Sequence, residues 1–129
     1  MTKVLHTESA PAAIGPYVQG VDLGNMVLTS GQIPVNPVTG EVPEAIADQA
    51  KQSLENVKAV VESSGLTVAD IVKLTVFVKD LNDFGTVNEV YGQFFDEHKV
   101  AHYPARSCVE VARLPKDVNI EIEAIAVRK

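Results

Sequence analysis

The chain has 129 residues and a formal net charge of −6. This length suits one domain, so we expect a single folded unit over residues 1–129 with one hydrophobic core. The acidic balance and the lack of a clustered run of Lys and Arg argue against a nucleic-acid partner, because phosphates require such clusters. The single cysteine cannot form an internal disulfide, and no apolar run approaches about 20 residues, so we expect a cytoplasmic protein without a membrane partner.

The first half of the chain predicts a strand, a hairpin and a helix. Residues 2–6 form a candidate short strand, and residues 17–22 and 26–32 form two strands joined by a Leu-Gly-Asn turn. Residues 44–64 then repeat apolar side chains every three and four positions, which predicts a helix. Its apolar stripe consists of Ile46, Ala50, Leu54, Val57 and Val61.

The second half begins with residues 71–78, which are rich in β-branched side chains and apolar on both faces, as a central strand is. A second helix starts near Asn82 or Asp83, both suitable caps, and ends near His98. Pro104 then imposes an extended backbone on the approach to the last segment. The apolar stripe of the second helix consists of Phe84, Val87, Tyr91, Phe94 and Phe95.

This order of elements predicts an α/β (α+β) fold that contains one mixed sheet of five or six strands. Two helices can cover one face of such a sheet but not both. The other face must therefore meet water, a ligand or another subunit.

The last segment, PARSCVEVARLPKDVNIEIEAIAV (residues 104–127), alternates apolar and polar residues and predicts a closing hairpin. We choose the register that keeps the aliphatic side chains together, because burying each large one contributes roughly 1.5–3 kcal/mol. The polar face would then hold, in facing pairs, Arg106 and Glu123, Cys108 and Glu121, and Glu110 and Asn119. That face is either a solvated surface with weak ion pairs or a site where a guanidinium binds a carboxylate and a glutamate activates water.

The closing segment and the stretches AIGPYVQG, TSGQIPV and VFVKDLNDF resemble the Rid family of reactive intermediate deaminases, over essentially the whole chain. The resemblance implies a chorismate-mutase-like fold and a homotrimer, with the sheets as an inner barrel and ligand clefts between subunits. It also implies hydrolysis of enamine and imine substrates, 2-iminobutanoate and 2-iminopropanoate, to 2-oxo acids and ammonia without a cofactor.

The resemblance assigns catalytic roles to Arg106 and Glu121. Arg106 is similar to the arginine that binds the substrate carboxylate; the alternative is a structural ion pair with Glu123 or Glu110. Glu121 is similar to the residue that positions or activates the attacking water; the alternative is an ordinary exposed glutamate.

From the same resemblance, five further residues are expected at the substrate. Cys108 is expected to form a pocket wall, because a hydrolytic reaction needs no thiol nucleophile, and a buried cysteine without a role would look alike. Tyr17 would orient substrate or water, or only pack. Ser30 and Gly31 form a turn where the backbone can approach a ligand, or where the glycine only shapes the turn. Asn88 would face the cleft or simply lie on a helix surface.

A metal site is not expected, because His98 and His102 lie four residues apart but near a helix end, with no third ligand apparent. The leading hypothesis is thus an imine deaminase. The alternatives are a protein that binds small 2-oxo acids without turnover, and the ribonuclease or translation-inhibitor role of some Rid relatives, which the acidic charge disfavours.

Overall fold

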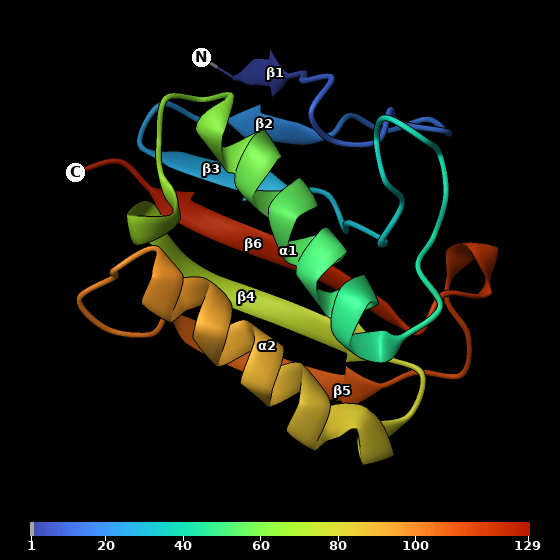
Figure 1. Ribbon diagram of the computed structural model, residues 1–129. Coiled ribbons are helices and arrows are strands. Elements are labelled where there is room, and N and C mark those ends of the chain that lie inside the picture. Colours follow the sequence, from blue (N-terminus) through green and yellow to red (C-terminus); the bar gives the residue numbers. More distant parts are fainter. Residues whose placement is uncertain (1) are drawn as a thin grey trace.

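Six strands form one mixed sheet in the computed structural model, which describes residues 2–129 (Figure 1). The strands are β1 Lys3–Leu5, β2 Gly20–Asp22, β3 Met26–Thr29, β4 Ile71–Val78, β5 Ala105–Glu110 and β6 Ile120–Val127. Their spatial order is β1-β2-β3-β6-β4-β5, and every neighbouring pair is antiparallel except β4 with β5. The predicted mixed sheet is confirmed, with β4 flanked on both sides.

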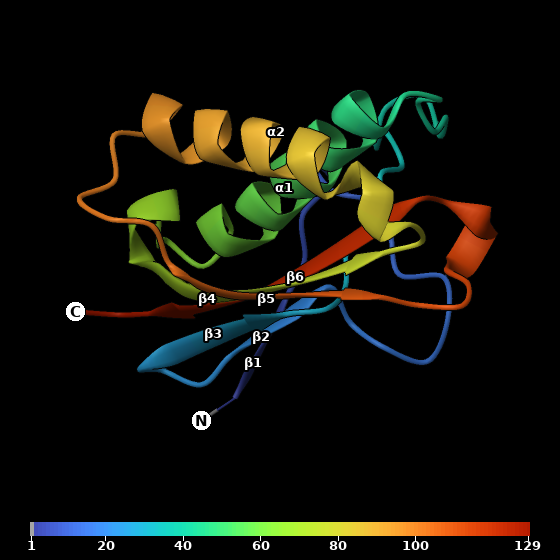
Figure 2. The same cartoon turned by 90° about the horizontal axis from the view of Figure 1, so that it is seen from below.

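Two helices, α1 Ile46–Glu62 and α2 Phe84–Glu97, pack side by side on the same face of the sheet, as predicted (Figure 2). Gly65 adopts a φ of +92° just beyond α1, a conformation that glycine allows at little cost and that ends the helix. The entry to α2 differs from the prediction, because a short 3₁₀ turn, Leu81–Asp83, precedes it. Asp80 caps that turn by accepting a hydrogen bond from the Asn82 N–H at 2.8 Å.

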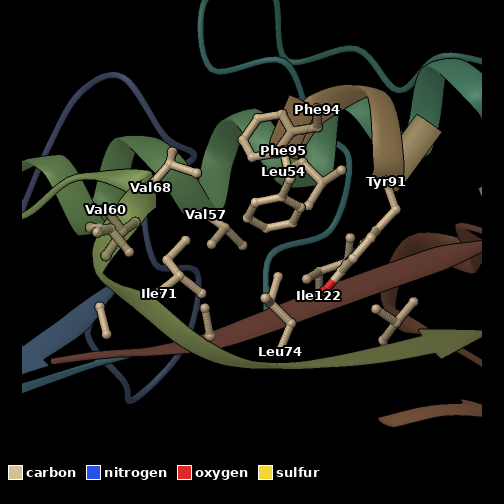
Figure 3. Close-up of a cluster of buried hydrophobic side chains, with 14 of the residues drawn as sticks. Leu54, Val57, Val60, Val68, Ile71, Leu74, Tyr91, Phe94, Phe95 and Ile122 are labelled. Carbon is tan, nitrogen blue, oxygen red and sulfur yellow. The ribbon is translucent and has the colours of Figure 1, made fainter. Parts of the chain in front are cut away.

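The hydrophobic core lies between the helices and the sheet (Figure 3). Both predicted apolar stripes contribute to it, except that Phe84 is 40% exposed at the start of α2. Phe94 and Phe95 meet edge to face with ring centroids 5.2 Å apart. Fully buried members of the core include Leu54, Val57, Val60, Leu74, Val76, Val78, Phe95, Ile120 and Ile122.

The predicted hairpin between β5 and β6 is wrong, because β4 lies between these two strands. Strand β5 follows α2 and returns parallel to β4, as strand–helix–strand units do. Strand β6 then runs antiparallel along the other edge of β4. The connection between β5 and β6 is an excursion that contains the 3₁₀ turn Pro115–Asp117, not a tight hairpin turn.

This topology also overturns the predicted facing pairs. In the parallel ladder, the partners are Leu74 with Arg106, Val76 with Cys108, and Val78 with Glu110. In the antiparallel ladder, they are Thr75 with Glu123 and Phe77 with Glu121. Since Leu74, Val76 and Val78 are buried beneath the helices, Arg106 lies on the helix-covered face. Glu121 and Glu123 lie on the opposite, open face.

Among residues 2–129 no helix covers the open face of the sheet, which carries both apolar and polar side chains (Figure 2). Val4 and Val109 are 65% and 44% exposed, and their neighbours on this face are only partly buried. Its apolar side chains include Val4, Val21, Leu28, Phe77, Val109 and Ile125, and its polar side chains include Lys73, Thr75, Ser107, Glu121 and Glu123. Neither helix of the described chain has the length and apolar character that a bilayer crossing needs.

The difference in burial along β4 gives a first prediction. Leu74→Ala should lower the free energy of unfolding by about 2–5 kcal/mol, because it leaves a cavity beneath the helices, where Leu74 is 0% exposed. Val72→Ala, in the same strand, should cost about 0.5 kcal/mol or less, since Val72 is 41% exposed. Urea denaturation at one fixed protein concentration measures both, and equal losses would contradict this difference in burial.

Candidate active site

Arg106 extends from the edge strand β5 to the underside of α2. Its Nη1 donates a hydrogen bond to Asn88 Oδ1 at 2.6 Å. Its Cζ lies 4.9 Å from the ring centroid of Tyr91 and 5.3 Å from that of Phe84, within the range of a cation–π contact. The contacts with Phe84, Asn88 and Tyr91 therefore all come from α2, and an aromatic residue precedes and follows Asn88 along this helix.

Among residues 2–129, Arg106 makes no ion pair. The two glutamates considered as ion-pair partners of Arg106 lie elsewhere. Glu110 Oε1 accepts a hydrogen bond from the Leu81 N–H at 2.9 Å, and Glu123 lies on the opposite face of the sheet. The structural ion pair considered for Arg106 is therefore wrong, and the guanidinium keeps an uncompensated charge.

A hollow of about 370 Å³ opens beside this guanidinium. It is lined by Asn88, Tyr91, Gly92, Tyr103, Pro104 and Arg106. Tyr103 closes one side, where its hydroxyl donates to Asp96 Oδ1 at 2.9 Å. A partly buried cation that borders a hollow and has no carboxylate partner can bind a small anion.

Cys108 follows two residues after Arg106 on the same face of β5 and is partly buried. Burial raises the pKa of its thiol, and the nearby Arg106 only partly offsets this effect. A thiol with a raised pKa stays protonated at neutral pH and is a poor nucleophile. This state agrees with a wall residue and not with a covalent catalyst.

Glu121 lies on the open face beside the turn that contains Ser30 and Gly31. A Cβ atom on Gly31 would collide with the Glu121 carboxylate, so the lack of a side chain at Gly31 leaves room for this carboxylate. The Ser30 hydroxyl donates to Val18 O at 2.6 Å and fixes the turn. Burial raises the pKa of Glu121, and the charge of Glu123 raises it further.

Tyr17 belongs to neither group of residues. It is 48% exposed, and its hydroxyl accepts a hydrogen bond from the Ile14 N–H at 3.4 Å within the same loop. The predicted site residues thus fall into two groups in one chain. Arg106, Asn88 and Cys108 lie together beneath α2, whereas Glu121, Ser30 and Gly31 lie together on the other side of the sheet.

Sequence reasoning assigned Phe84 and Tyr91 only to the core and missed their contact with Arg106. Their spacing to Asn88, four residues before and three residues after, places all three on one side of α2 and was the available signal. The two histidines proposed and rejected as metal ligands lie near the end of α2, where His98 Nδ1 is 2.7 Å from Phe94 O. Residues 2–129 contain no group of three or more His, Cys, Asp or Glu side chains suited to a metal ion.

Known proteins match this chain over nearly its whole length. A family described as endoribonuclease L-PSP matches residues 7–128. The chain is 75% identical over 129 residues to the 2-iminobutanoate/2-iminopropanoate deaminase of Escherichia coli K12, covering 100% of both chains. It is 74% identical to a RutC family protein of Haemophilus influenzae, covering 100% of this chain and 99% of that protein. The chain belongs to the Rid family.

Solved structures of Rid relatives share this fold. A Vibrio vulnificus protein is 89% identical, with a TM-score of 0.97 and coverage of 98% of this chain and 99% of that chain. Escherichia coli TdcF, crystallised with bound serine, is 69% identical with the same TM-score and coverage. The resemblance inferred from the sequence motifs is therefore confirmed.

The two causes of the raised Glu121 pKa can be separated. Glu123→Gln removes the neighbouring negative charge and leaves the burial of Glu121 in place. The pKa of Glu121 should fall but stay above its usual range, because burial is the larger cause. A titration of carboxyl ¹³C signals, with Glu121 assigned by its loss in Glu121→Gln, measures this change. An unchanged pKa would remove Glu123 from the electrostatics of the site.

Proposed function

We propose that this Rid protein hydrolyses 2-iminobutanoate and 2-iminopropanoate to the corresponding 2-oxo acids and ammonia. The observation that carries the proposal is Arg106, a partly buried guanidinium with no carboxylate partner that borders a hollow of about 370 Å³. Both substrates carry a carboxylate, which an arginine fork binds through paired hydrogen bonds. The Escherichia coli relative, at 75% identity over the full length, is named for this activity.

In the proposed reaction, Arg106 holds the substrate carboxylate and thereby places the imine carbon. Glu121 accepts a proton from a water molecule whose oxygen bonds to that carbon, and the electron pair of the C=N bond moves to nitrogen. The nitrogen takes up a proton from water, which gives the carbinolamine. A second proton, returned by Glu121, lets the nitrogen leave as ammonia, and the hydroxyl group releases its proton to water as the carbonyl of the 2-oxo acid forms. A pKa raised by burial makes Glu121 a stronger base than an ordinary glutamate, which general base catalysis requires. No step uses a cofactor or the Cys108 thiol.

One chain cannot supply both groups to one small substrate. Arg106 and Glu121 lie on opposite faces of the sheet, and β4 separates their strands. At about 4.8 Å per strand spacing, the two strands are roughly 10 Å apart. We infer a homotrimer in which the open sheet faces form an inner barrel. Each cleft would combine Arg106 of one subunit with Glu121 of the partner subunit, and the exposed Tyr17 would enter a neighbour's cleft.

Two other functions remain to be distinguished from the deaminase. A 2-oxo acid binding protein would use the same Arg106 pocket without turnover, and the serine bound to TdcF shows that one relative holds a small carboxylate ligand. The family description names an endoribonuclease, but a net charge of −6 disfavours contact with phosphates. The single cysteine suits the reducing cytoplasm, the location we infer.

The functional test generates 2-iminobutanoate in situ, follows its disappearance, and measures 2-oxobutanoate binding by calorimetry. Arg106→Ala should weaken both binding and rate, and Arg106→Lys should restore little because an ammonium lacks the fork. Glu121→Gln should keep most of the binding and lower turnover by roughly 10²–10⁴-fold. Saturable binding without acceleration by the wild type would favour the binding protein instead.

The proposed assembly predicts complementation between inactive variants. Arg106→Ala and Glu121→Gln chains should each be inactive alone but regain roughly a quarter of wild-type activity when co-expressed in equal amounts. Every mixed cyclic trimer contains one cleft with both native side chains, and about three quarters of the trimers are mixed. A monomeric mass by light scattering, or no recovery in trimers verified as mixed, would refute the shared cleft.

A further inference from the structure

We propose that Phe84, Asn88 and Tyr91 are positioning residues that fix the Arg106 guanidinium, and that Asn88 acts through Arg106 and not by touching substrate. We call this set the α2 clamp. The inference rests on the proposed function only in taking Arg106 as the group that binds the substrate carboxylate. The geometry of the clamp itself is a property of the chain.

The α2 clamp is built from one side of one helix. Residues at positions i, i+4 and i+7 of a helix lie in a row, and Phe84, Asn88 and Tyr91 have this spacing. Two of them present aromatic rings to the guanidinium, at 5.3 and 4.9 Å, and the middle one accepts the 2.6 Å hydrogen bond from Nη1. A single rigid element thus contacts the guanidinium three times.

The chemistry of the clamp is as informative as its geometry. Every group that holds Arg106 is neutral: two π faces and an amide oxygen. A carboxylate in place of Asn88 would hold the guanidinium equally well but would cancel its charge. A neutral clamp restrains the side chain while leaving its full charge to a ligand. Since arginine has five N–H donors, the bond to Asn88 leaves donors free for a carboxylate.

The clamp is anchored at one end in the core. Tyr91 is 6% exposed and packs on Phe95 with ring centroids 4.9 Å apart, so its ring cannot easily move. Burial raises the pKa of Tyr91 to about 12, so its hydroxyl is neutral at physiological pH and adds no charge. Phe84, at the other end, is 40% exposed. The guanidinium therefore bridges from a fixed interior ring to the edge of the hollow.

The first test changes charge at the amide. Asn88→Asp should weaken 2-oxobutanoate binding by roughly 10-fold or more, because an anionic partner competes with the ligand. Asn88→Ala, which only frees the side chain, should weaken it less, about 3- to 10-fold. Gln93→Glu adds the same charge on the exposed side of α2 and serves as the matched control. Equal affinity of Asn88→Asp and the control would overturn the assignment.

The second test observes the guanidinium directly. The chain has only three arginines, so its Nε–H spectrum is simple, and Arg106→Lys identifies the Arg106 signal. Because ring currents act on nearby protons, Phe84→Leu should move that signal and leave those of Arg113 and Arg128 in place. It should also weaken 2-oxobutanoate binding by roughly 2- to 10-fold. Melting curves confirm that the variant remains folded.

The two tests separate the clamp from the proposed function. If the wild type neither binds 2-oxobutanoate nor hydrolyses the imine while Phe84→Leu still shifts the Arg106 signal, the clamp is supported and the function is rejected. If the wild type hydrolyses the imine, and both Phe84→Leu and Asn88→Asp keep its 2-oxobutanoate affinity and its Arg106 Nε–H signal, the clamp alone is rejected.

Discussion

The position of β4 between β5 and β6 decides where every candidate functional side chain lies. Because paired residues of neighbouring strands share a face, the helix-facing Leu74 places Arg106 beneath α2. The alternate residue Phe77 places Glu121 on the open side. An alternation that would have gathered these side chains on one face of a hairpin instead distributes them to both faces of the sheet. The proposed reaction would therefore need a second subunit to bring both groups to one substrate.

The separation also keeps Arg106 from lowering the pKa of Glu121. A carboxylate close to a guanidinium has its pKa lowered, which would weaken it as a base. In this chain Glu121 is held beside Gly31 and Glu123, far from Arg106, and its pKa is raised. Arg106 contacts an amide and two aromatic rings, and it forms no ion pair with a carboxylate of the described chain. The two faces of the sheet thus hold a guanidinium without a carboxylate partner in the described chain and a glutamate with a raised pKa.

Local pattern was sufficient for the elements but not for their neighbours. The periodicity of residues 44–64 and the β-branched run at residues 71–78 predicted α1 and β4 closely, because both depend on side-chain spacing within one segment. Alternation in the last segment correctly separated Ile120 and Ile122 from Glu121. It could not reveal that β5 pairs with β4, since strand pairing is a long-range choice that the strand–helix–strand connection decides.

The candidate site shows a related limit. Sequence pattern identified Arg106 and Glu121 as chemically unusual and assigned Tyr91 to the core, and the family resemblance placed Asn88 at a cleft. Neither revealed that Tyr91 and Asn88 contact Arg106, because a helical stripe does not say what lies beneath it. In the structure one side chain serves both purposes: Tyr91 packs against Phe95 and also carries the Arg106 contact. Core packing and the position of the Arg106 guanidinium are therefore coupled through α2. We therefore expect any change that lets this helix shift in the core to move the guanidinium as well, even when the altered residue does not touch Arg106.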